Sequence, residues 1–207
     1  MKLLWNLLDT LKLSLPALLL VTTVHEYPHG IVARMLGDDT GERAGRLKWN
    51  PLSHLDPVGS VAFVLFGYGW TRPIPVNKWK FKHPVRDTIL VALLGPVSNV
   101  LLGVVFYILY FRLKSILLAN SYPMAFILFV ARSSVGFGLF NLFPIPPMDG
   151  AKIMLALVPE EYMGWYAKYE VYGILLAVVL IILRIPAFLM HPVTVFLSEL
   201  TSKIAGG

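Results

Sequence analysis

The sequence contains no cysteine among its 207 residues. Disulfide bonds and thiolate metal ligands are therefore excluded, and any metal bound by this chain must use histidine and carboxylate side chains. Charged residues are also scarce, at 14% against about a quarter in ordinary soluble domains, whereas 57% of the residues are hydrophobic. No long hydrophilic block remains for a separate soluble module. The composition predicts a mainly α-helical, polytopic membrane protein with a single embedded domain over residues 1–207.

The apolar stretches predict about four to six transmembrane helices. The clearest cover residues 11–36, 88–111, 123–142 and 171–189, and about 20 residues suffice to cross the hydrocarbon. A short helix is expected over 151–157, and a short amphipathic tail follows the last span. The N-terminal stretch resembles a signal peptide, but it has no convincing small-residue cleavage site, so we expect it to be retained.

Residues 58–76 form a different kind of segment. Its apolar part, 58–70, is too short for a comfortable span and is rich in glycine and aromatic residues, and a proline-containing run follows. This pattern predicts a re-entrant or β-hairpin-like segment, with a plain interfacial loop as the alternative. Irregular backbone at membrane depth must lie against protein or a wet cavity. An exposed strand edge here would be able to pair with an extended peptide.

The basic residues flank the apolar stretches. Although the net charge is +6, this placement is typical of membrane topology signals, and nucleic-acid binding is not expected. The segment 38–87 holds eight Lys and Arg residues and the segment 112–122 holds two. The positive-inside rule therefore places the first segment in the cytoplasm and the N-terminus outside. The expected surroundings are a lipid bilayer, and no pattern indicates an oligomeric state.

One apolar stretch contains the run His25-Glu26-Tyr27-Pro28-His29. Between Lys12 and Arg34 the only formal charge is Glu26. On a helix, residues four apart project from one face, so His25 and His29 can bind the same metal ion. Glu26 lies beside them, where a carboxylate can take a proton from water. Ionisable groups are expensive in hydrocarbon and predict a functional site there, although a chance HExxH match is the alternative.

Two histidines do not complete a catalytic zinc site, which usually has three protein ligands. Asp149 is the best third candidate, because it follows a proline-rich run at the end of an apolar stretch and precedes Gly150. Prolines break the helix there, and glycine permits close approach. The alternative is that Asp149 caps the helix expected to start at Ala151. Spacing alone does not separate the two.

These motifs together resemble the site-2 protease family of intramembrane zinc metalloproteases. That family has an N-x-x-P-x-x-P-x-D-G signature downstream of its HExxH helix, and this chain matches it at every position with Asn141-Leu142-Phe143-Pro144-Ile145-Pro146-Pro147-Met148-Asp149-Gly150. The stretches 50–59 and 95–99 also resemble its bacterial and archaeal members. The similarity spans about residues 24–152, and there is no sign of PDZ or CBS domains.

The resemblance implies that His25, His29 and Asp149 bind Zn²⁺ and that Glu26 is the general base. It implies that Asn141 holds the substrate or stabilises the reacting carbonyl. The expected function is hydrolysis of peptide bonds in or near the transmembrane segments of substrate proteins. The expected location is a prokaryotic cell (inner) membrane, with the site opening toward the cytoplasm. The partner would be a transmembrane protein or peptide that unwinds locally.

Pro28 is a departure from the family, whose members usually have a small residue there. Proline lacks a backbone donor and clashes with the carbonyl of Val24, so a kink is expected at the metal site. This motivates an alternative function, a catalytically impaired metal-binding scaffold or regulator of the same fold. A metal-ion transporter is a further alternative, but it would need polar residues along several spans.

Other polar or glycine positions carry weaker predictions. His54 and Asp56 are expected to make loop hydrogen bonds, and Asn99 to bond a neighbouring helix, with substrate contact as its alternative. Gly95-Pro96 is expected to permit close packing or a bend near the HExxH helix. Arg132 lies within an apolar stretch, and the sequence does not identify a carboxylate that would pair with its guanidinium.

Overall fold

The computed structural model describes residues 2–114, 116–117, 121–159 and 163–206. The described residues form α-helices and two short 3-10 turns, with no β-strand. The helices are α1 (Lys2–Met35), α2 (Thr40–Arg43), α3 (Pro57–Phe66), α4 (Pro84–Leu113), α5 (Tyr122–Phe140), α6 (Asp149–Leu157), α7 (Met163–Ile182) and α8 (Ile185–Ile204), and the turns are η1 (Pro51–His54) and η2 (Lys78–Lys80). The mainly helical fold class is thereby confirmed.

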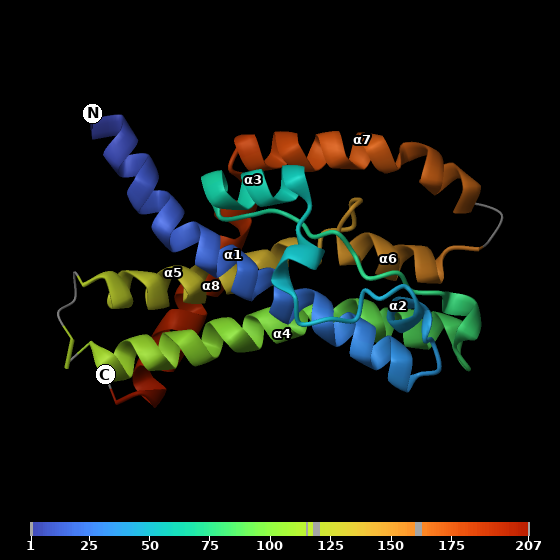
Figure 1. Ribbon diagram of the computed structural model, residues 1–207, viewed down its shortest axis with the longest axis horizontal. Helices are drawn as coiled ribbons and strands as arrows, with labels where there is room; N and C mark the ends of the chain where they lie inside the picture. Colours follow the sequence, from blue (N-terminus) through green and yellow to red (C-terminus); the bar gives the residue numbers. More distant parts are fainter. Residues whose placement is uncertain (1, 115, 118–120, 160–162, 207) are drawn as a thin grey trace.

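Helices α1, α4 and α5 pack against one another and form the centre of the molecule (Figure 1). α6 packs on α4, α8 crosses α4 and α5, and α7 lies with α3 on the opposite side from α4. One buried apolar cluster joins α1, α3 and α5 through Leu18, Val21, Phe63, Val130 and Phe137. This packing fixes α1, which carries the HExxH run, against α3 and α5.

Two described helices, α4 and α5, are long and apolar enough to cross a bilayer. A third span results if the bent pair formed by 171–182 and α8 counts as one. This is fewer than the four to six spans that the apolar stretches predicted. The expected first span, 11–36, is helical within α1 as far as Met35.

The predicted span 171–189 is broken in the structure. α7 ends at Ile182, and α8 starts at Ile185 with a bend of 65°. Arg184 adopts a left-handed conformation (φ 57°), and Pro186 follows in the first turn of α8. Proline is favoured in the first turn of a helix and disfavoured in its interior, so Pro186 starts a new helix and does not continue α7. The expected amphipathic tail is accordingly a full helix.

Residues 57–77 start as a helix and continue as an extended chain. α3 ends at Gly67, whose left-handed conformation (φ 78°) provides the helix cap. The extended part makes a single isolated antiparallel bridge, between Leu55 and Thr71, so the described chain has no β-hairpin here. The side chain of Ile74 is buried against α1 near Gly30. The segment 71–77 is thus fixed along the second half of α1.

A polar cluster fastens the far end of this extended segment. The buried Asp38 carboxylate accepts hydrogen bonds from the backbone N–H of Thr40 (3.0 Å) and of Asn77 (2.6 Å). The Lys80 ammonium donates to Asp39 (2.6 Å), and this hydrogen bond lowers the pKa of the Asp39 carboxyl. The segment that follows α1 and the turn η2 are therefore held together through charged groups.

The close contact of α4 and α5 provides a test of the fold. A Cβ added to Gly103 would lie 2.4 Å from Val135 Cγ2 and 2.8 Å from Ala131 O. We expect Gly103→Ala to destabilise the protein by about 1–3 kcal/mol, because the two helices must separate. Thermal unfolding in detergent would measure this. Leu101→Ala, at an exposed position of α4, is the control and should change stability by less than about 0.5 kcal/mol.

Candidate metal centre

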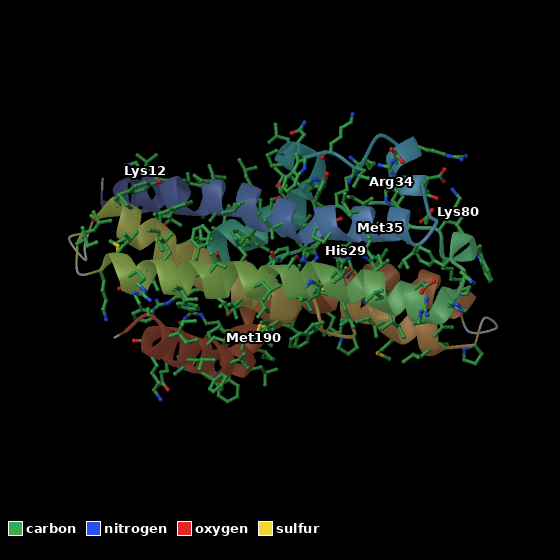
Figure 2. All side chains as sticks on the ribbon, turned by 90° about the horizontal axis from the view of Figure 1, so that it is seen from below. Lys12, His29, Arg34, Met35, Lys80 and Met190 are labelled. Carbon is green, nitrogen blue, oxygen red and sulfur yellow. The ribbon has the colours of Figure 1, made fainter. Side chains whose placement is uncertain are left out.

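Three potential ligand atoms from two distant segments meet in the interior. His25 Nε2 lies 2.9 Å and His29 Nε2 lies 3.1 Å from Asp149 Oδ2, and the two nitrogens are 3.4 Å apart. All three side chains are buried. His29 lies midway along the bundle between α1 and α4 (Figure 2). The residues that the motifs predicted as a ligand set therefore form one cluster.

Local structure explains how each ligand reaches the cluster. His25 and His29 are four residues apart on α1 and share one of its faces. Asp149 is the first residue of α6 and does not cap it; its carboxylate turns to the histidines instead. The N–H of Gly150 donates to Asn141 O (2.8 Å), and a Cβ on Gly150 would lie 2.2 Å from Leu142 O. Glycine is therefore required beside the ligand.

Hydrogen bonds orient the two imidazoles. His29 Nδ1 lies 2.7 Å from Val91 O, which can only accept, so Nδ1 carries the proton and Nε2 presents a lone pair to the cluster. His25 Nδ1 lies 3.2 Å from the amide of Asn99. Asn99 Oδ1 is buried and has no hydrogen-bond partner among the described residues. If the Asn99 side-chain amide is rotated by 180°, its Oδ1 accepts a hydrogen bond from a protonated Nδ1 of His25. His25 Nε2 then carries no proton and presents a lone pair to the cluster, as His29 Nε2 does.

This donor set fits a zinc ion. Two imidazole nitrogens and a carboxylate oxygen would repel one another through their lone pairs unless a cation or a proton lay between them. Zinc–ligand distances of about 2.0–2.2 Å in a tetrahedron place ligand atoms about 3.3–3.6 Å apart, so the observed separations of 2.9, 3.1 and 3.4 Å would need to widen by at most a few tenths of an ångström. His25, His29 and Asp149 would hold the ion, and the fourth position would be open for water or substrate.

Gly95 of α4 lies directly against the cluster. A Cβ at this position would be 2.1 Å from His29 Nε2 and 2.8 Å from His25 Cε1. No side chain larger than hydrogen fits there without moving a ligand. The prediction that Gly95 permits close packing near the HExxH helix is confirmed.

Both carboxylate oxygens of Glu26 bind the extended segment. Oε1 accepts a hydrogen bond from the Thr71 hydroxyl, and Oε2 accepts one from the backbone N–H of Ile74 (2.9 Å). Neither partner was predicted from the sequence, because nothing near Thr71 or Ile74 signals a tertiary contact with α1. The candidate base is therefore also an anchor for the segment 71–76.

Lys152 is a further residue that the sequence reasoning missed. Its ammonium lies 2.7 Å from Asp149 Oδ1, so the other oxygen, Oδ2, is left to the histidines. The two residues are three apart on α6, a spacing at which opposite charges commonly pair and which is visible in the sequence.

Asn141 follows the last residue of α5, and its side-chain amide donates to Phe137 O (2.9 Å). Its backbone carbonyl positions Gly150, so Asn141 supports the loop that carries Asp149.

The weaker candidates have structural partners. His54 Nε2 lies 2.9 Å from Lys48 O, and Asp56 caps α3 through the N–H of Gly59 (2.8 Å), which confirms their loop roles. Asn99 bonds α1 across helices, as expected for a lone amide. Arg132 borders a separate cavity of about 390 Å³ that Tyr107 and Glu199 also line.

A largely apolar cleft of about 380 Å³ leads to the metal centre. Glu26, His29 and Lys152 are among the residues that line it. Its walls come from three elements: the extended segment at 73–76, the first half of α4 at Thr88, Val91 and Ala92, and α6 at Leu155 and Ala156. Apolar groups have the chemical character that such a cleft accepts.

Comparison with known proteins gives one informative match. A protein of Bacillus subtilis (strain 168) named "Putative zinc metalloprotease YwhC" is 36% identical to this chain, and the match covers 87% of each of the two chains. This chain belongs to the YwhC family. No protein-family profile and no solved structure matches it. The name of the YwhC relative agrees with the protease family that the motifs predicted, while the narrower site-2 assignment stays a prediction.

The contact at Gly95 predicts a specific loss. Gly95→Ala should abolish zinc binding, because the new methyl group occupies the position of the His29 ring. Zinc content of the purified protein would measure this. Gly103→Ala is the matched control on the same helix and should lower stability while zinc is retained. Full zinc occupancy in Gly95→Ala would contradict the ligand geometry.

The ion pair of Lys152 predicts a milder effect. Lys152→Met should weaken zinc binding about 10–100-fold, as is usual when a residue that orients a metal ligand is removed. Competition with a chromophoric chelator would report the affinity. Lys152→Arg retains a donor for Asp149 Oδ1 and should bind zinc within a few-fold of the unaltered protein; equal losses in both variants would argue against the ion pair.

Proposed function

We propose that this protein is an intramembrane zinc metalloendopeptidase of the site-2 type, which hydrolyses peptide bonds in or near the transmembrane segments of substrate proteins. The observation that supports the proposal is the convergence of His25, His29 and Asp149 beside an apolar cleft that Glu26 and His29 line. The YwhC relative, named as a zinc metalloprotease, supports the same reaction class.

The roles of the residues follow from their chemistry. A zinc ion at this site would lower the pKa of water and polarise the scissile carbonyl. Glu26 accepts the proton that water loses as its oxygen bonds to the carbonyl carbon, and it returns a proton to the amine as the C–N bond breaks. Thr71 and Ile74 hold the carboxylate in place during both transfers. The products are one new carboxylate and one new amine.

Asn141 is assigned a supporting role in this proposal. Its amide is occupied by Phe137 O, and its carbonyl holds Gly150 next to Asp149. Contact between that amide and the substrate, as the family resemblance implies, would require release of the bond to Phe137. These hydrogen bonds therefore support a positioning role for Asn141 at the third metal ligand more directly than a contact with the substrate.

The cleft favours an extended substrate over a helical one. Its wall at 73–76 contains Pro73 and Pro75, which have no N–H, and the N–H of Ile74 is bound to Glu26. This wall therefore offers few N–H donors. Pro73 O accepts from the Arg46 guanidinium (3.4 Å), and a substrate strand would supply N–H donors to the other carbonyls. A helical segment has those donors bound internally, so the substrate must unwind before it pairs.

The side on which the cleft opens follows from charge. Lys78 borders the cleft, and Lys80 and Arg34 lie at the same end of the molecule (Figure 2). By the positive-inside rule this end faces the cytoplasm. We propose a prokaryotic cell membrane as the location, with water reaching the metal from the cytoplasmic side and with a transmembrane protein as the partner.

The test is cleavage of a transmembrane peptide by purified protein in lipid vesicles. The zinc-loaded protein should cleave the peptide, and Glu26→Gln should bind zinc equally while its rate falls by at least about 100-fold, because the proton acceptor is lost. Zinc content is measured on the same samples. Removal of zinc by a chelator should stop cleavage, and added zinc should restore it.

The same experiment separates the alternative function. If the unaltered protein binds zinc stoichiometrically and cleaves none of a panel of transmembrane peptides, the protein is the metal-binding scaffold or regulator. Cleavage that is equally fast with Glu26→Gln would also overturn the assignment, because it would arise from a contaminating protease.

A further inference from the structure

Helix α1 contains two interior prolines, Pro16 and Pro28, yet it runs unbroken from Lys2 to Met35. A proline has no backbone N–H, so the carbonyl four residues earlier loses its helical partner. The two carbonyls in question belong to Lys12 and Val24. In a low-dielectric interior, a carbonyl without a hydrogen bond is costly.

Each of these carbonyls accepts a hydrogen bond from a side-chain hydroxyl of another helix. The Tyr122 hydroxyl donates to Lys12 O (2.8 Å), and the Ser98 hydroxyl donates to Val24 O (2.8 Å). Tyr122 begins α5, and Ser98 lies in α4. The same replacement of a missing N–H by a hydroxyl therefore occurs at both prolines of this helix.

The second replacement lies at the metal centre. The turn from Val24 to Pro28 includes the ligand His25 and the candidate base Glu26. If the Val24 carbonyl had no donor, it would tilt away from the axis or admit water, and either change bends a helix at that point. Asp149 comes from another segment and would not follow such a bend. The separation of His25 Nε2 and Asp149 Oδ2, 2.9 Å, would then change.

We propose that Ser98 is a positioning residue of the metal centre, whose hydroxyl substitutes for the backbone donor that Pro28 removes. Pro28 and Ser98 are then a functional pair, and Pro28 is compatible with an intact site because Ser98 is present. The Ser98 hydroxyl also lies 2.7 Å from Gly95 O in its own helix, which gives it a second acceptor when Val24 O is otherwise satisfied.

A double-mutant cycle tests the pair. Ser98→Ala, Pro28→Ala and the combined variant are compared with the unaltered protein by zinc affinity, from chelator competition, and by the visible absorption of the cobalt-substituted site. Ser98→Ala should weaken zinc binding about 10–100-fold and alter the cobalt spectrum. Pro28→Ala should match the unaltered protein, because the introduced alanine supplies a backbone N–H to Val24 O. The combined variant should match Pro28→Ala.

Tyr122→Phe and Pro16→Ala are matched controls, since they change the same chemistry away from the metal. Both should leave zinc affinity and the cobalt spectrum unchanged. Ser98→Thr retains the hydroxyl and should bind zinc within a few-fold of the unaltered protein. This variant and the combined variant keep the test informative if Ser98→Ala alone folds poorly.

Two results would overturn the proposal. One is normal zinc affinity and an unchanged cobalt spectrum in Ser98→Ala. The other is a combined variant as weak as Ser98→Ala, which would show that Ser98 acts other than through the Val24 carbonyl. The proposal rests on the metal centre and not on peptide hydrolysis, so zinc binding without cleavage would refute the proposed function and leave the pair intact.

Discussion

The structure depends on the meeting of one carboxylate with two imidazoles inside a helical bundle. Asp149 Oδ2 lies within 3.1 Å of both His25 Nε2 and His29 Nε2. These groups are buried, and buried ionisable groups are tolerated only where they are paired or bound to a metal. The neighbouring features serve this contact: the bare backbone of Gly95, the turn at Gly150, and the Lys152 ammonium on the outer carboxylate oxygen.

A second network links the metal centre to the cleft. Glu26 lies next to His25 in the sequence, and its two oxygens hold Thr71 and Ile74 of the extended segment. The segment is fixed at its other end through Asn77 and the buried Asp38. The cleft wall is therefore attached to the helix that carries the metal ligands. A displacement of either one changes the distance between the cleft wall and the candidate metal ligands.

The amino-acid sequence was sufficient for the helical fold class and for placing His25 and His29 on one helix face, because both are periodic or local properties. His25 and His29 share a helix face at any position of that helix, and an absence of cysteine restricts the metal chemistry. It was insufficient for the number of spans. Hydropathy alone does not show that a chain turns at Arg184, or that the polar groups of α1 are sheltered by α4 and α5.

Tertiary structure decided which partner each polar group has. The sequence left Asp149 open between a helix cap and a metal ligand, and the loop fixed by Gly150 and Asn141 directs it to the histidines. It suggested that Pro28 disturbs the site, whereas the structure supplies Ser98 to the freed carbonyl of Val24. Such contacts join residues far apart in the chain, and their geometry exists only after the helices have packed. Local pattern therefore determined which groups are present, and packing determined what each one binds.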